Sequence, residues 1–139
     1  MSARTKSRKR AVDAVFAADI RGKSPIELLD DTLEQNSDRQ NQDVIFAYAR
    51  DIVEGVIKHK DEIDAYLEAY SQGWTLDRMP TLDRAIMRVA TWEIVFNDDV
   101  PDSVAVNEAV EIAKEYSTDD SPAFINGLLN KIASTKTAL

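Results

Sequence analysis

The chain has 139 residues, a formal net charge of −8 and no cysteine. This length fits one domain with its own hydrophobic core, and the lack of Cys excludes disulfides, thiolate metal sites and a cysteine nucleophile. No apolar run approaches the roughly 20 residues of a membrane-spanning helix. We therefore expect a cytoplasmic protein that works outside membranes.

Positive charge is concentrated at the start of the chain. Of the 17 Lys and Arg residues, five lie among the first ten positions, whereas all 25 Asp and Glu residues follow them. The five cations are Arg4, Lys6, Arg8, Lys9 and Arg10. A cationic segment on an acidic body favours a nucleic-acid contact, because such side chains neutralise phosphates. The alternatives are a solvated, frayed terminus and a transit peptide.

A helix pattern follows directly behind the cations. Val12, Val15, Phe16 and Ile20 recur at helical spacing, and the pattern ends near Gly22. A cleavable presequence is not expected to lead into a core pattern, which disfavours the transit peptide. At about 100° per residue the five cations point around most of the helix. We therefore expect the first turn or two to project beyond the protein or to uncoil, burying little and leaving the cations free.

Start signals for three further helices follow. Ser24-Pro25 and Ser121-Pro122 each have the sequence of an N-cap followed by proline at the first helical position, and Thr81 is predicted to cap another helix. A fourth start is predicted at Pro101, and the tail from residue 134 is expected to fray.

The middle of the chain carries the longest helical pattern. Apolar residues over 45–70 recur mostly at steps of three, four or seven, which predicts one long helix or two with a bend near Gly55 or residues 58–60. No segment shows the period-two alternation of a strand. The fold is predicted to be all-α, with about six or seven helices in sub-bundles of about residues 1–72 and 73–139.

Residues that carry chemistry are scarce. The four glycines, at positions 22, 55, 73 and 127, are too far apart to form a phosphate-binding loop. His59 is the only histidine and lies in a charged stretch, where we expect a solvated surface residue. Adjacent carboxylates such as Asp119-Asp120 fall in predicted turns. We predict no catalytic residue, no metal site and no cofactor, and hence no enzyme.

The start of the last helix is a second candidate site. Free N–H groups at a helix N-terminus suit a phosphate, and Phe124 in the first turn could stack an unpaired base. The alternative is that Phe124 belongs to the core beside Ile125 and Leu128, and the local pattern favours that alternative.

Four segments together resemble the NusB family of transcription factors. They are RKRAVDAVF at 8–16, LDRAIMRVA at 82–90 with Trp92-Glu93, Val100-Pro101 with VAVNEAVEIAK at 104–114, and FINGLL at 124–129. The segments occur in the order and at the spacing of the family and span nearly the whole chain.

The resemblance implies two small helical bundles packed together. It also implies binding of single-stranded boxA RNA in nascent ribosomal RNA transcripts, together with a small-subunit ribosomal protein in its NusE role. The factor would then promote antitermination in an elongation complex with RNA polymerase and other Nus factors. The resemblance assigns RNA contacts to the five N-terminal cations, Phe16, Asp120 and Phe124, and partner contacts to Phe16 and Asp83.

Two other functions are open. The same helical module occurs in ribosomal-RNA cytosine methyltransferases, so the chain could be a detached RNA-targeting module of such an enzyme. It could also be a helical protein-interaction module or a homodimer in which the basic start plays no part.

Overall fold

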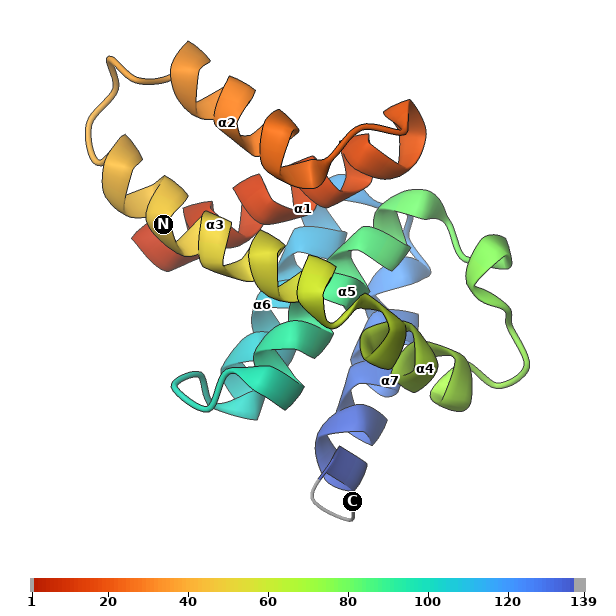
Figure 1. The fold of residues 1–139 in the computed structure, drawn as a ribbon. Helices are drawn as coiled ribbons and strands as arrows, with labels where there is room; N and C mark the ends of the chain where they lie inside the picture. The colour runs from red at the N-terminus through yellow and green to blue at the C-terminus, as the bar shows by residue number, and fades with distance from the viewer. Residues whose placement is uncertain (1, 137–139) are drawn as a thin grey trace.

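The structure, a computed structural model, describes residues 2–136 and contains seven α-helices and no strand in that range (Figure 1). This confirms the all-α prediction and its number of helices. The helices are α1 (Ala3–Arg21), α2 (Pro25–Gln35), α3 (Gln42–Lys58), α4 (Lys60–Tyr70), α5 (Thr81–Phe96), α6 (Asp102–Tyr116) and α7 (Ser121–Thr135), with a short 3₁₀ helix η1 (Leu76–Arg78) before α5.

Helix α1 is continuous from its cap to its end. The Ser2 hydroxyl accepts a hydrogen bond of 3.1 Å from the backbone N–H of Thr5, and Gly22 ends the helix with φ 68°. The buried Ser7 hydroxyl donates a bond of 2.7 Å to the carbonyl of Ile45 in α3. The expectation that the first turns project or uncoil is therefore wrong, because α1 packs against α3 from its second turn.

The apolar stripe of α1 rotates out of the core along the helix. Val12 and Val15 are buried, Phe16 is half-buried and Ile20 is 62% exposed. Each four-residue step advances a helix face by about 40°. The prediction that Ile20 faces inward is wrong for this reason.

The other predicted boundaries hold to within one residue. Ser24 and Pro25 occupy the predicted N-cap and first helical positions. Thr81 and Ser121 are instead the first residues of their helices, and Pro80 and Asp120 take the cap positions. Ser121 does not cap because its hydroxyl is hydrogen-bonded within the protein to the carboxylate of Asp83.

The predicted bend in the 45–70 segment is confirmed at His59, between α3 and α4. The His59 ring is not a solvated surface group, since it stacks on Phe96 with 3.8 Å between ring centroids. One turn earlier, a Cβ on Gly55 would lie 1.9 Å from Nε1 of Trp92. Only glycine lets the indole approach α3 this closely.

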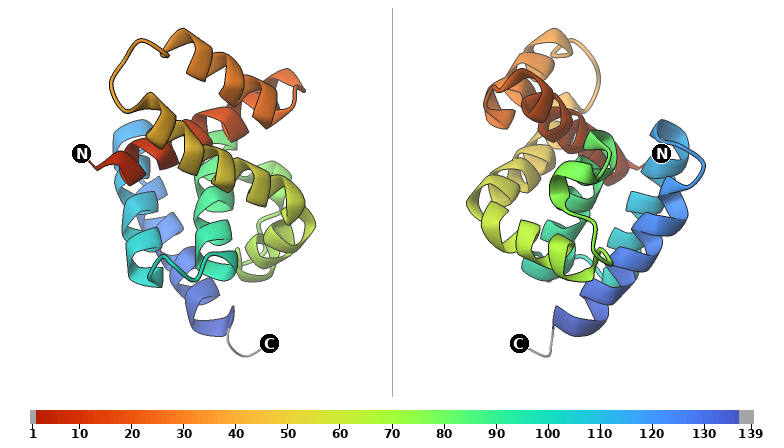
Figure 2. Two further views of the ribbon diagram at one scale, coloured as in Figure 1. Left: turned by 60° about the vertical axis from the view of Figure 1, so that its left-hand side comes forward. Right: turned by 90° about the vertical axis from the view of Figure 1, so that its right-hand side faces the viewer.

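Helix α5 lies at the centre of the fold. It contacts α1, α3, α4, α6 and α7, with α1, α2 and α3 on one side and α6 and α7 on the other (Figure 2). Buried apolar side chains from all seven α-helices form one cluster. The sub-bundle boundary near residue 72 stays a prediction. Across residues 2–136, no helix has the length and apolar character required to cross a membrane.

Candidate nucleic-acid interface

The side chain of Arg8 points into the protein and is not free to bind a phosphate. The residue is 4% exposed, and its Nε lies 2.8 and 3.0 Å from the two carboxylate oxygens of Glu93. Its Nη1 lies 3.2 Å from Glu108. Burial lowers the pKa of Arg8, but the hydrogen bonds and charge of Glu93 outweigh it and raise the pKa above its ordinary value. In this structure the guanidinium of Arg8 is buried and paired and is not presented to a phosphate, so the RNA contact of Arg8 stays a prediction.

Tyr48 joins this buried network from α3. Its hydroxyl donates a hydrogen bond of 2.6 Å to Glu93, and the guanidinium of Arg4 lies 3.8 Å from its ring centroid. Burial, followed by the hydrogen bond to Glu93, raises the pKa of Tyr48 to about 12. Arg4 is exposed but lies over α3, in a groove that it shares with His59.

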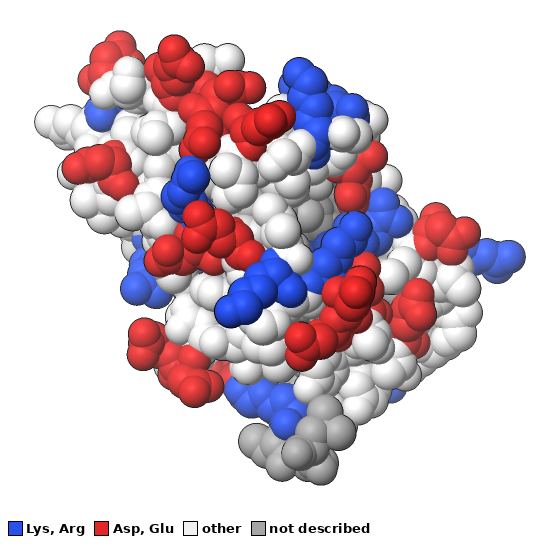
Figure 3. Space-filling model, viewed as in Figure 1, with Lys and Arg blue, Asp and Glu red and all other residues white. Residues whose placement is uncertain are grey.

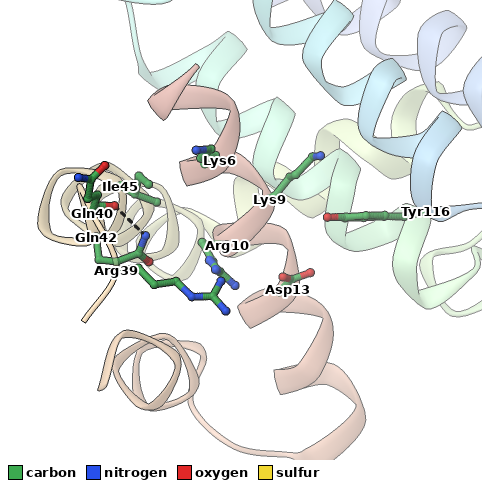
Figure 4. A pocket seen from close by; sticks show the side chains of 9 residues that line it. All are labelled: Lys6, Lys9, Arg10, Asp13, Arg39, Gln40, Gln42, Ile45 and Tyr116. Atoms are coloured by element: carbon green, nitrogen blue, oxygen red, sulfur yellow. Dashed lines mark hydrogen bonds between the residues drawn. The ribbon is translucent and has the colours of Figure 1, made fainter. Parts of the chain in front are cut away.

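The other three N-terminal cations meet in one place. Lys6, Lys9 and Arg10 line a hollow of about 390 Å³ together with Arg39, which comes from the turn between α2 and α3 (Figure 4). We call this site the α1 hollow. Its remaining lining residues are Asp13, Gln40, Gln42, Ile45 and Tyr116.

Two cations of the α1 hollow, Lys9 and Arg10, have neighbours that position them. The Lys9 amine lies 2.5 Å from the carboxylate of Glu115 and 5.5 Å from the ring centroid of Tyr116. The Arg10 guanidinium lies 5.6 Å from the ring centroid of Phe46. Aromatic rings stabilise cations through their quadrupole while leaving N–H groups available.

The α1 hollow carries four positive charges and one carboxylate, that of Asp13. Asp13 is exposed to solvent, but partial desolvation by the surrounding protein raises the pKa of its carboxyl group, against the attraction of Arg10 and Lys9. On the face of the protein seen in Figure 1, acidic side chains gather along α2 (Figure 3). A local excess of cations on a protein with net charge −8 directs an anion to this hollow.

Sequence reasoning missed Arg39, Gln42 and Tyr116. Arg39 is the only Lys or Arg between Lys23 and Arg50. This isolated positive charge was the one feature of the sequence that could have pointed to Arg39. No spacing rule connects it with the N-terminal cations. Only the packing of α3 against α1 brings the turn to that cluster.

The structure brings three other predicted residues together. Asp83, Asp120 and Phe124 line a hollow of about 290 Å³ between η1 and the starts of α5 and α7, which we call the α7 hollow. The exposed Trp74 completes its wall, with a ring centroid 6.4 Å from that of Phe124. Phe124 is half-buried against the core and also lines this hollow, so both predicted roles stay open for it.

Asp83 and Phe16, the predicted partner contacts, lie at different depths. Asp83 is 3% exposed and accepts hydrogen bonds of 2.5 Å from the Ser117 hydroxyl and 2.6 Å from the Ser121 hydroxyl. Its carboxylate therefore joins α5 to α7, in addition to lining the α7 hollow. Phe16 is half-buried against the core. Their roles toward a partner stay predictions.

The structure is that of an all-α protein with a cluster of cations on its first helix. The sequence model of the NusB family matches residues 5–134. The transcription antitermination protein NusB of Leifsonia xyli subsp. xyli is 54% identical over 136 residues, which cover 98% of this chain and 94% of that protein. The chain belongs to the NusB family, as the sequence motifs predicted.

Solved structures show the same fold. NusB of T. maritima is 31% identical with a TM-score of 0.84, over 98% of this chain and 97% of that one. A chain in a crystal structure of the antitermination factors NusB and NusE in complex with double-stranded RNA is 24% identical. Its TM-score is 0.86, over 97% of this chain and 98% of that one. This second likeness establishes the fold.

Proposed function

We propose that this chain is a transcription antitermination factor that binds single-stranded RNA through the α1 hollow. The observation that carries the proposal is the convergence of Lys6, Lys9 and Arg10 with Arg39 from a separate turn. Cations from two segments in one hollow fit a phosphate backbone. The name of the 54% identical relative, transcription antitermination protein NusB, supports the same function.

The RNA strand crosses α1 between the α2–α3 turn and the end of α6. Tyr116, at that end of α6, is 39% exposed and offers an aromatic face beside Lys9. Unpaired bases stack on such faces, whereas duplex bases are not available to them. An aromatic ring next to clustered cations therefore favours a single strand.

Family membership supports a proposal for the RNA sequence and for the partner. We assign the boxA element of ribosomal RNA transcripts as the RNA and a small-subunit ribosomal protein, in its NusE role, as the partner. RNA polymerase and other Nus factors complete the elongation complex. Phe16 and Asp83 are the proposed partner contacts.

The α7 hollow is the proposed second RNA contact. Trp74 and Phe124 supply two aromatic rings there, and the exposed carboxylate of Asp120 lies at their edge. A carboxylate repels an incoming phosphate. Asp120→Asn therefore tightens RNA binding if the strand reaches α7 and has no effect if the strand stays on α1.

The methyltransferase alternative has less support. The Leifsonia relative is named as an antitermination protein, and the match covers 94% of its length. The likeness thus covers most of the length of a protein named for antitermination. The homodimer alternative stays a prediction.

A salt titration tests the function. Fluorescent single-stranded boxA-like RNA is titrated with the protein, alone and with the ribosomal protein, at several salt concentrations. Two to four phosphate contacts give a slope of log K against log salt of about −1.4 to −2.8, at roughly 0.7 per phosphate. The double substitution Lys6→Gln/Arg10→Gln flattens this slope and weakens binding at least tenfold, at about 1.4 kcal/mol per tenfold.

The matched control is Lys131→Gln/Arg50→Gln, which removes the same two charges from exposed positions outside both hollows. It leaves affinity within about twofold. A salt-independent affinity, or equal losses in both double variants, contradicts the proposed site.

A further inference from the structure

A buried acceptor without a partner lies in the wall of the α1 hollow. Gln42, the first residue of α3, is 9% exposed, and its Nε2 donates a hydrogen bond of 3.2 Å to the carbonyl of Gln40. Its Oε1 has no hydrogen-bond partner within residues 2–136. An orphaned carbonyl lowers stability. In the free protein, the unpaired carbonyl of Gln42 therefore lowers the free energy of unfolding.

The setting of Gln42 is built for an anion. Arg39 extends from the α2–α3 turn toward α1, where Arg10 lines the same space, and the Gln42 amide lies beside them (Figure 4). Asn41, at the N-cap of α3, has φ 61° and makes no side-chain capping bond. The uncapped N-terminus of a 17-residue helix therefore adds its partial positive charge to that of the two guanidinium groups.

Gln42 differs from the other unpaired buried groups of the described chain. Those are Nε of Arg84 and Oγ1 of Thr91, both in α5 and neither in the lining of the α1 hollow. If Gln42 served only to cover the core, an apolar side chain would do so without an unpaired carbonyl. An acceptor next to a cationic hollow instead matches a ligand that carries a phosphate and a hydrogen-bond donor.

We propose that the α2–α3 turn completes the RNA site and selects the nucleotide held there. Arg39 binds a backbone phosphate together with Arg10, and Oε1 of Gln42 accepts a hydrogen bond from the same nucleotide. The donor is either the ribose 2′-hydroxyl or a base N–H group, which are the donors that a nucleotide offers. This inference rests on the proposed RNA-binding function.

The first test separates Arg39 from general charge. RNA binding is titrated against salt for Arg39→Gln and for Arg50→Gln, an arginine on the exposed side of α3 outside the hollow. Arg39→Gln weakens binding roughly three- to tenfold and flattens the salt slope by about 0.7, the value for one phosphate contact. Arg50→Gln changes neither quantity. Equal behaviour of the two variants overturns the role of Arg39.

The second test concerns the unpaired carbonyl. Gln42→Met keeps the length of the side chain and removes its acceptor, so the melting temperature does not fall, whereas RNA affinity drops several-fold. The same sequence as DNA identifies the donor. A loss confined to RNA assigns the 2′-hydroxyl, and an equal loss on DNA assigns the base. Unchanged affinity of Gln42→Met for both oligonucleotides overturns the role of Gln42.

The two levels of proposal fail in different ways. If the parent protein binds no RNA, or if Lys6→Gln/Arg10→Gln binds as the parent does, the proposed function fails. If the parent binds and that double variant is weakened, while Arg39→Gln and Gln42→Met match their controls, only the inference on the turn is overturned.

Discussion

The two faces of the first turns of α1 both carry basic residues, but these residues are buried on one face and line a hollow on the other. On the inner face, Arg8 is 4% exposed and bound to carboxylates of α5 and α6. On the outer face, Lys6 and Arg10 line the α1 hollow. Neighbouring basic residues of one helix thus have two roles: one binds α1 to α5 and α6, and the others are available to an anion. Charge alone does not indicate which role a residue has, because the packed neighbours decide it.

The inner face forms a nearly complete polar network. Glu93 accepts hydrogen bonds from Arg8 and Tyr48, and the Thr5 hydroxyl donates a bond of 2.7 Å to Glu108. Such a network, when satisfied, fixes one arrangement of the helices that it joins. It holds α1 against α3, α5 and α6, and thereby sets the direction in which the outer cations point.

Removal of Glu93 gives the largest expected effect. Glu93→Ala leaves the buried guanidinium of Arg8 without its main partner, which lowers the free energy of unfolding by about 3–5 kcal/mol. Urea unfolding followed by circular dichroism measures the change. The matched control is Glu115→Ala, which removes the exposed partner of Lys9 on the outer face. It costs less than about 1 kcal/mol.

Similar losses of stability in Glu93→Ala and Glu115→Ala would contradict the proposed difference between the two faces. The pair Arg8→Met/Glu93→Leu sharpens it, because replacing both charges with apolar groups avoids an unpaired charge and costs less than Glu93→Ala alone. A double variant less stable than Glu93→Ala would show that the network contributes more than charge pairing.

High pH is expected to lower the stability of the protein through the inner face, because Tyr48 ionises there. The folded pKa of Tyr48 is raised from 10.0 to about 12 by burial and by Glu93, so its contribution is complete below pH 10 and is lost between pH 10 and 12. Two pH units correspond to at most about 2.7 kcal/mol, and partial exposure makes the loss smaller. Urea unfolding over this pH range measures it.

The control for the alkaline loss is Tyr48→Phe. This variant has no phenol to ionise at position 48, so its stability falls less steeply above pH 10 than that of the parent. Parallel curves for parent and variant would show that Tyr48 does not carry the alkaline loss.

Asp13 gives the smallest expected effect and belongs to the outer face. Its carboxylate lines the α1 hollow among four cations, so Asp13→Asn removes a repulsion and tightens RNA binding by roughly two- to fivefold. Because partial desolvation raises the pKa of Asp13, lowering the pH through its titration neutralises the carboxyl group and strengthens RNA binding more in the parent than in Asp13→Asn.

The control for this effect is Asp31→Asn, which removes a carboxylate from the exposed side of α2. Fluorescence titration at two pH values distinguishes the variants. An equal gain from both substitutions would indicate general electrostatics and not the geometry of the α1 hollow.

Local signals explain what could be predicted. The N-cap residue of α2, the proline at its first position and the glycine after α1 act within one turn of the chain, so they are visible in the sequence. The break between α3 and α4 is also local. The prediction for Ser121 missed by one position because its hydroxyl bonds to Asp83, 38 residues away in the chain.

Long-range contacts explain what could not be predicted. Helix periodicity places Arg8 on the side of Val15 and Arg10 on the opposite side. The carboxylate of Glu93 that binds Arg8 is 85 residues away in the chain, so the local sequence could not show that Arg8 would be buried and paired. Arg39 and Gln42 lie in a polar segment that reads as an ordinary turn. Their place in the α1 hollow depends on how α3 packs on α1.

The sequence by itself determined the all-α fold, the family and the cationic start of the chain, because helix periodicity, local motifs and composition need no tertiary information. Only the tertiary structure decided which cations are available to an anion. A side chain is buried or exposed according to the helices packed around it, and those helices come from distant parts of the chain. For this reason Arg8 became part of the core, while Arg39 joined the candidate RNA site.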